Sequence, residues 1–151
     1  MAERGYTIKR TFDAPPEVVF EAWTDPEQFA IWFGTESAEM QDVELDVRPG
    51  GRWKGTMVVP GGRRIEWQGV YREVSKPDRL VMDLSDQPGD EYERYTATFT
   101  AHGKKTDMEL SQTGGHLSDE EYEHARAGTD SFMDSLARCL PGMLKARHDA
   151  Y

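Results

Sequence analysis

The side chains in this sequence that are best able to do chemistry are four histidines and one cysteine. His102 and His116 fall in predicted turns, His124 lies on the polar side of a predicted helix, and His148 is near the C-terminus. None of them is spaced so as to pair with a serine or cysteine nucleophile. Cys139 lies in a predicted helix, where a single cysteine is more often a small buried side chain than a nucleophile. The spacing therefore assigns no catalytic residue.

Glu121 and His124 form a Glu-x-x-His spacing that could serve a metal ion. Di-metal bundle sites use this motif twice, together with further glutamates, so a solvated helix surface is the favoured interpretation. The sequence contains no His-Glu-x-x-His zinc signature, no glycine-rich phosphate loop and no Cys-x-x-Cys pair. We predict neither a metal site nor a cofactor.

The predicted strand over residues 64–74 places acids, a base and aromatic side chains close together, and its facing allows two interpretations. In the first, Glu73 faces the interior, where burial would raise its pKa and let it act as a general base. The residues that would face inward with it are Trp67, Gly69 and Tyr71.

In the second interpretation, Val70 and Val74 face the interior and Glu73 lies outside. An outward Glu73 would then pair across the sheet with Arg72, Arg94 or Lys54. We favour this second arrangement, which leaves the interior without an assigned general base.

The chain has 151 residues and a formal net charge of -10. One domain of this size buries roughly 70% of the surface that its unfolded chain exposes, so we expect a single domain over residues 1–151. The negative charge repels phosphate, which argues against nucleic acid and anionic membranes as partners. The N-terminus lacks the apolar run of a signal peptide, and no window approaches the ~20 apolar residues of a membrane span. We predict a cytoplasmic location.

The first third of the chain predicts one strand and two short helices. Alternation over residues 6–12 indicates a strand. Asp13 with two following prolines predicts the start of a helix, and Asp25 with Pro26 predicts the start of a second. The second helix is rich in aromatic side chains and should end at Gly34.

Residues 38–113 show period-two alternation in six segments, which are separated by short turns rich in glycine and proline. Short connections predict antiparallel neighbours. A Ser-x-x-Glu capping box at Ser118 predicts the start of a long amphipathic helix, which we expect to bend at Gly128 and to end or kink at Pro141. The acidic residues of this region are expected to form a solvated surface.

This order predicts an α+β fold with a curved antiparallel sheet of about seven strands. One amphipathic helix against the sheet would bury the apolar faces of both.

Five segments carry a resemblance to a known family, because unrelated turns and helix starts match in the right order: residues 10–34, 45–57, 67–81, 97–114 and 127–140. They resemble the proteins similar to the activator of the Hsp90 ATPase. This family lies within the START-like (SRPBCC) helix-grip superfamily, which also contains polyketide cyclases and lipid carriers. Thr129 departs from the family pattern, which usually has a tryptophan there, and Thr35 stands where a proline is common. Without that tryptophan, the pocket could be larger unless Phe132 or Met133 fills the space.

The resemblance implies a cavity between the sheet and the long helix, with the two short helices closing one end. Phe29, Trp32 and Phe33 would form its lid or rim, while Phe12, Phe20 and Trp23 would hold the short helices on the sheet. The expected lining is apolar and aromatic, with two tyrosines as polar groups: Phe29, Trp32, Phe33, Trp53, Met57, Trp67, Tyr71, Met82, Tyr95, Phe99, Met108, Phe132, Met133 and Leu136.

The leading functional hypothesis is the binding of a small hydrophobic or aromatic molecule in this cavity, without catalysis or with weak catalysis. One alternative is an enzyme of the cyclase or aromatase type, which requires an inward ionisable group. Another, which rests on the family name, is a regulator of a chaperone ATPase. A homodimer is a further possible assembly.

Overall fold

The computed structural model describes residues 5–33, 39–85, 93–114 and 117–149. Within these ranges the elements follow one another as β1 (Gly5–Phe12), α1 (Pro16–Thr24), α2 (Pro26–Phe33), β2 (Glu39–Leu45), β3 (Arg52–Val58), β4 (Arg64–Ser75), β5 (Arg79–Ser85), β6 (Glu93–His102), β7 (Lys105–Thr113) and α3 (Asp119–Asp149). Gly34, predicted to end the second helix, lies outside the described residues.

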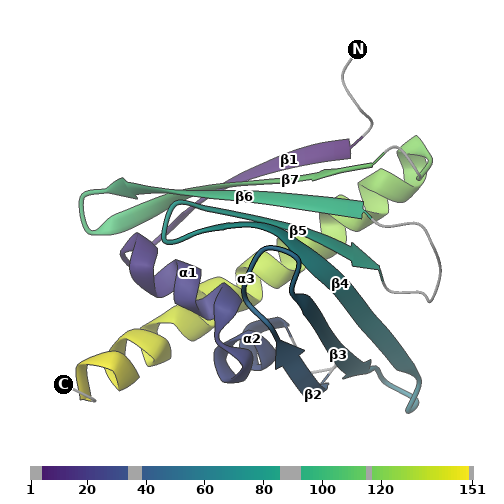
Figure 1. The fold of residues 1–151 in the computed structure, drawn as a ribbon, viewed down its shortest axis with the longest axis horizontal. Coiled ribbons are helices and arrows are strands. Elements are labelled where there is room, and N and C mark those ends of the chain that lie inside the picture. The colour runs from purple at the N-terminus through teal and green to yellow at the C-terminus, as the bar shows by residue number, and fades with distance from the viewer. Residues whose placement is uncertain (1–4, 34–38, 86–92, 115–116, 150–151) are drawn as a thin grey trace.

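The strands form one seven-stranded antiparallel sheet in the order β1-β7-β6-β5-β4-β3-β2. Figure 1 shows the twisted sheet with the long helix α3 running across it and the short helices α1 and α2 beside α3. The helix α3 packs against β1 and against both short helices. The predicted α+β class is confirmed, including seven strands, two short helices and one long C-terminal helix. None of the helices within the described ranges combines the length and the apolar character needed to cross a bilayer.

The starts of the helices follow the predicted signals. Pro15 caps α1 and Pro16 occupies its first turn, where a missing N–H leaves no helical hydrogen bond unmade. The Asp25 Oδ1 atom accepts hydrogen bonds from the backbone N–H groups of Glu27 and Gln28 at the start of α2, at 2.9 and 3.2 Å. These local contacts fix where each short helix begins.

The capping box of α3 is confirmed, whereas the helix does not end at Pro141, which was one of the two outcomes predicted there. The Glu121 N–H donates to Ser118 Oγ at 3.1 Å, and the Ser118 N–H donates to Glu121 Oε1 at 2.9 Å. The helix then continues through Gly128 and Pro141 to Asp149. Pro141 is exposed, so water can satisfy the carbonyl group that loses its partner one turn earlier.

A β-bulge in β4 explains why the facing of this strand was ambiguous. The register with β5 shifts between Tyr71 and Glu73. Before the shift Tyr71 faces the interior, and after it Val74 packs against the core. Glu73 therefore lies outside, as favoured, but its predicted partners are wrong: it pairs with Arg79 at 3.0 Å. Trp67, Gly69 and Tyr71 lie on the inner side before the bulge and Val74 after it. Val70, which was also predicted to face inward, is the register partner of the outward Asp83.

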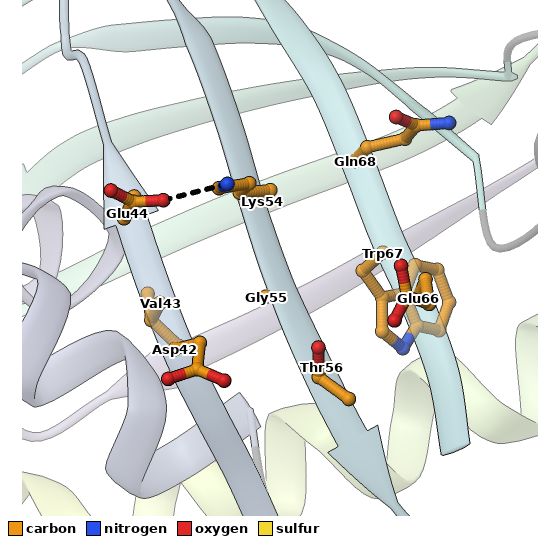
Figure 2. Close-up of a pocket in the computed structure, with 9 residues that line it drawn as sticks. All are labelled: Asp42, Val43, Glu44, Lys54, Gly55, Thr56, Glu66, Trp67 and Gln68. Carbon is orange, nitrogen blue, oxygen red and sulfur yellow. Dashed lines mark ion pairs between the residues drawn. The ribbon is translucent and has the colours of Figure 1, made fainter.

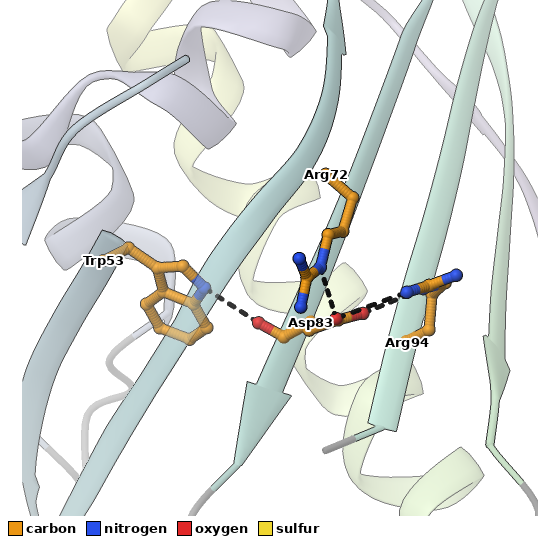
Figure 3. A network of polar contacts seen from close by, with 4 residues as sticks. All are labelled: Trp53, Arg72, Asp83 and Arg94. Atoms are coloured by element: carbon orange, nitrogen blue, oxygen red, sulfur yellow. Dashed lines mark hydrogen bonds and ion pairs between the residues drawn. The ribbon is translucent and has the colours of Figure 1, made fainter. Parts of the chain in front are cut away.

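Trp53 crosses from β3 to β5 over a glycine. Its indole Nε1–H donates to the backbone oxygen of Asp83 at 3.2 Å, as Figure 3 shows. The strand between them contributes Gly69, the register partner of Trp53. A Cβ atom at Gly69 would lie 2.3 Å from Trp53 Nε1 and 1.8 Å from the Asp83 oxygen. The absence of a side chain at Gly69 thus leaves the space in which the indole crosses β4.

The carboxylate of Asp83 is nearly buried on the opposite, outer face of the sheet. Arg72 Nε donates to it at 2.7 Å and Arg94 Nε at 2.8 Å, as Figure 3 also shows. Burial alone would raise the pKa of Asp83, but the hydrogen bonds and charges of the two guanidinium groups outweigh burial and lower it. The acid is therefore ionised at neutral pH.

Substitution of Gly69 by alanine tests the crossing of β4 by Trp53. We expect Gly69→Ala to lower the free energy of unfolding by about 3 kcal/mol, because the added methyl group overlaps the indole and a backbone oxygen. The control is Gly128→Ala in α3, where an added Cβ meets nothing within 4 Å. This control should gain about 0.5–1 kcal/mol. Urea unfolding measures both, and a Gly69→Ala variant as stable as the parent would contradict the account.

The Asp83 ion pairs should make stability depend on pH in a definite direction. Since the folded-state pKa lies below the ordinary 3.8, the contribution of Asp83 is present above that value and is lost as the pH falls through the folded-state pKa. We expect Asp83→Asn to cost about 2 kcal/mol at pH 7 and less at pH 3.

The control for this charge removal is Glu44→Gln, whose partner Lys54 is exposed, and it should change the free energy of unfolding by under about 0.5 kcal/mol. Urea unfolding at pH 7 and pH 3 measures the free energy of unfolding of both variants. An Asp83→Asn loss that is equal at pH 7 and pH 3 would contradict the ionic assignment.

Candidate functional site

Three aromatic side chains from α2, β4 and α3 meet where the interior reaches the surface. The rings of Phe33 and Phe132 stack with centroids 4.5 Å apart and planes inclined by 9°. The Trp67 ring stands edge-on to Phe33, with centroids 5.3 Å apart. Phe33 is buried, whereas Trp67 and Phe132 are half-buried. We call these three residues the aromatic corner.

Phe29 and Trp32, which were expected at the lid or rim with Phe33, lie deeper than Phe33. Trp32 is fully buried, its Nε1–H donates to the Ala22 oxygen at 2.6 Å, and its ring lies 4.7 Å from that of Trp23. The Phe29 ring packs between Phe33 and Trp53. These contacts join α1 and α2 to β3.

All of the predicted lining residues belong to one hydrophobic cluster. Every member is buried except Trp67 and Phe132, which pack against the cluster from its edge. The structure thus brings together the set Phe29, Trp32, Phe33, Trp53, Met57, Trp67, Tyr71, Met82, Tyr95, Phe99, Met108, Phe132, Met133 and Leu136. Their role as the lining of a ligand site stays a prediction.

A row of side chains crosses the inner face of the sheet and carries three tyrosines. Its members are register partners in consecutive strands from β4 to β1: Tyr71, Met82, Tyr95, Gln112 and Tyr6. Adjacent strands lie roughly 4.8 Å apart, so one small molecule could touch neighbouring members. We call this set the tyrosine row.

One end of the tyrosine row takes part in a chain of hydrogen bonds that reaches α3. Tyr95 Oη lies 3.0 Å from Thr129 Oγ1, which lies 2.6 Å from Tyr6 Oη. The Tyr6 hydroxyl donates to Gln112 Oε1 at 2.5 Å, and Gln112 Nε2–H donates to Glu93 Oε1 at 3.2 Å. The chain therefore links three strands, β1, β6 and β7, and α3 to one inward carboxylate.

Thr129 does not simply leave an empty space where the family usually has a tryptophan. The side chain is buried, and its hydroxyl lies between two tyrosine hydroxyls. Its polar contacts explain why a small hydroxyl residue suits this position.

The other end of the tyrosine row is unsatisfied. The Tyr71 hydroxyl is buried in a residue with 0% exposure and has no hydrogen-bond partner among the described residues. The indole N–H groups of Trp67 and Trp23 are likewise buried without a partner there. Burial raises the pKa of Tyr71, so its hydroxyl keeps its proton at neutral pH and can donate.

The histidines and acids singled out for chemistry do not converge on the interior. Glu121 caps α3 and is exposed, as is His124. His102 is exposed and pairs with Asp107 at 3.0 Å. His116 and the side chain of His148 lie outside the described residues. No group of three or more metal-binding side chains occurs in the part of the chain that the structure describes.

The acidic surface predicted for α3 has a structural use at two positions. Arg10 lies on the inner row of β1, and its Nη2 atom is 2.8 Å from Asp134 Oδ1. Its Nη1 atom is 3.8 Å from Asp130. These ion pairs hold the middle of α3 on the first strand.

A pocket of about 660 Å³ is formed by β2, β3 and β4. Figure 2 shows the exposed Glu44, Lys54 and Glu66 of this pocket, with Lys54 Nζ 2.9 Å from Glu44 Oε2. The full lining is Asp42, Val43, Glu44, Lys54, Gly55, Thr56, Glu66, Trp67 and Gln68. Trp67 is the member of the predicted lining that it includes. This polar pocket therefore differs from the apolar cavity expected between sheet and helix.

Sequence reasoning missed Tyr6, Gln112, Glu93 and Arg10 as inward polar residues. The signal was the alternation itself, since Gln112 follows Met108 and Leu110 with period two, and Glu93 precedes Tyr95 with the same period. Their partners lie on strands and a helix distant in the sequence, so only the fold shows how each is satisfied.

A sheet that grips one long C-terminal helix, with two short helices at one side and an aromatic interior, defines a protein of the START-like helix-grip class. The chain belongs to the family described as activator of Hsp90 ATPase homolog 1-like protein, whose sequence profile matches residues 13–141. The suspected family is thus confirmed.

Solved structures support the same fold. A crystal structure of a Chromobacterium violaceum protein is 25% identical, with a TM-score of 0.79, over 89% of this chain and 96% of that one. A Staphylococcus epidermidis protein solved by NMR is 20% identical, with a TM-score of 0.80, over 94% and 92%. A Mycobacterium smegmatis protein is 23% identical, with a TM-score of 0.75, over 89% and 88%. No curated protein is significantly similar to the chain.

The hydroxyl of Thr129 should stabilise the fold through the two tyrosines. We expect Thr129→Val to lower the free energy of unfolding by about 2 kcal/mol, because Tyr95 and Tyr6 lose their shared partner. Thr100→Val, on the exposed side of β6, should change it by less than about 0.5 kcal/mol. Equal stability of the two variants in urea unfolding would show that the hydroxyl contributes nothing.

Proposed function

We propose that this protein binds a small, largely aromatic molecule in the interior between the sheet and α3, and that Tyr71 donates a hydrogen bond to it. The observation that carries the proposal is the Tyr71 hydroxyl, which is fully buried without a partner among the described residues. Leaving a buried hydroxyl unpaired costs about 1–3 kcal/mol. A guest with an acceptor atom would remove that cost.

The surroundings of Tyr71 support a guest with an aromatic body. Its register partner on β5 is Met82, a flexible side chain that adapts to different shapes. The indole N–H of Trp67, also buried without a partner in the described ranges, offers a second donor. The aromatic corner is the proposed way in, because Trp67 and Phe132 are only half-buried and one belongs to the sheet, the other to α3.

Two alternatives remain as proposals of lower rank. An enzyme of the cyclase type needs an inward ionisable group, and Glu93 meets that requirement. The family description mentions activation of the Hsp90 ATPase, which favours a chaperone partner. No contact among the described residues adds support for that partner.

The proposed function is tested with Tyr71→Phe and two probes, acetylnaphthalene and ethylnaphthalene. Removal of the unpaired hydroxyl should raise the free energy of unfolding by about 1 kcal/mol. It should weaken acetylnaphthalene, which has an acceptor oxygen, about five- to tenfold and leave ethylnaphthalene unchanged. Titration followed by tryptophan fluorescence measures the affinities, and urea unfolding measures the stability.

The matched control is Tyr6→Phe, which removes a hydroxyl that already has partners. This variant should lose about 2 kcal/mol of stability and keep the affinity for acetylnaphthalene. Absence of binding of both probes to the parent protein would overturn the proposed function. Equal weakening of both probes by Tyr71→Phe would overturn the role of the hydroxyl.

A further inference from the structure

Glu93 faces the interior, and only one of its two carboxylate oxygens accepts a hydrogen bond from the described residues. The strand β6 alternates so that Glu93, Tyr95 and Ala97 share the inner side. Glu93 Oε1 accepts from Gln112, whereas Glu93 Oε2 is buried without a hydrogen-bond partner among the described residues. A buried carboxylate oxygen that accepts no hydrogen bond is unusual, because no interaction offsets the free-energy cost of removing it from water.

The hydrogen-bond chain runs in one direction and ends on this carboxylate. An ionised carboxylate can only accept, so Gln112 turns its NH₂ group toward Glu93 and its carbonyl oxygen toward Tyr6. Because the Tyr6 hydroxyl donates its hydrogen bond to Gln112, the Thr129 hydroxyl must donate to Tyr6. The Tyr95 hydroxyl must then donate to Thr129. The hydroxyl protons of Tyr6, Thr129 and Tyr95 are therefore used within the chain, and Glu93 Oε2 receives no hydrogen bond from the described residues.

The negative charge of Glu93 is also uncompensated among the described residues. Asp83 on the outer face forms ion pairs with two arginines, whereas Glu93 forms none with the described residues. The preceding residues 86–92 contain no lysine or arginine in the sequence. A net charge of -10 further favours the approach of a cation over that of an anion.

The position of Glu93 places it within reach of a guest in the aromatic interior. Its register partner on β5 is Leu84, a member of the same hydrophobic cluster as Tyr71 and Trp53. Tyr95, two residues along β6, belongs to the tyrosine row. Glu93 thus lies where the apolar cluster adjoins the hydrogen-bond chain.

We propose that the guest carries a protonated amine and that Glu93 Oε2 binds it. The ligand class is therefore an aromatic or apolar amine, with its body in the hydrophobic cluster and its ammonium group at Glu93. This inference rests on the proposed function and adds the charge of the guest.

The test compares naphthylmethylamine with methylnaphthalene on the full chain. The parent protein should bind the amine at least about tenfold more tightly, as expected for one charge-assisted hydrogen bond. Glu93→Gln should reduce this preference to about twofold or less and leave the affinity for methylnaphthalene within twofold of the parent. Isothermal titration calorimetry measures all four affinities.

The control variant is Glu109→Gln, which removes the same charge from an exposed position on the outer side of β7. It should keep the preference for the amine. A preference that survives Glu93→Gln, or that Glu109→Gln removes equally, overturns the assignment to Glu93.

The outcomes separate the two proposals. If methylnaphthalene binds and the amine gains nothing, the inference fails and the proposed function stands. If neither compound binds, both fail. Should Glu93→Gln not fold, carbon NMR of the parent decides: the Glu93 side-chain carboxyl signal should shift with the amine and not with methylnaphthalene, and an unmoved signal overturns the inference.

Discussion

The packing of α3 across the inner face of the sheet is the interaction on which the remaining structure depends. Different kinds of contact hold successive parts of this helix. Tyr122 packs on the first strand near the helix start, Thr129 joins the hydrogen-bond chain, Asp134 pairs with Arg10, and Leu136 enters the main hydrophobic cluster. Because these contacts are spread along the helix, α3 is held on β1 and on both short helices. The short helices in turn pack on other strands, α1 on β6 and β7 and α2 on β2.

Covering the sheet in this way also brings polar groups into the interior, and they differ in how well they are satisfied. Tyr95 and Tyr6 share a partner on α3, whereas Tyr71, in the same row, has none among the described residues. Such a contrast within one row is informative, because the same burial produces a satisfied group in one place and an unsatisfied group in another. The unsatisfied groups are the ones that a ligand would complete.

The carboxylates on the two faces of the sheet differ in their partners. On the outer face, two guanidinium groups hold Asp83 and lower its pKa, so the acid contributes to stability. On the inner face, Glu93 receives one amide hydrogen bond. Register partners in β5 and β6 place Asp83 beside Arg94, while the inward row gives Glu93 an apolar neighbour, Leu84. Strand alternation therefore places one acid beside two arginines and the other where the described residues give it no ion pair.

The sequence by itself determined the element order, the α+β class and the starts of the helices, because these depend on local signals such as proline at a first turn, an aspartate cap and period-two alternation. The family resemblance also indicated which aromatic side chains gather in one cluster, although Phe29 and Trp32 lie deeper than the rim expected for them. Only the tertiary structure decided the partners: the bulge that turns Glu73 toward Arg79, the exposure that lets α3 continue through Pro141, and the link from Tyr6 to Thr129. These depend on strand register and on contacts between residues far apart in the chain, and no local pattern encodes either of them.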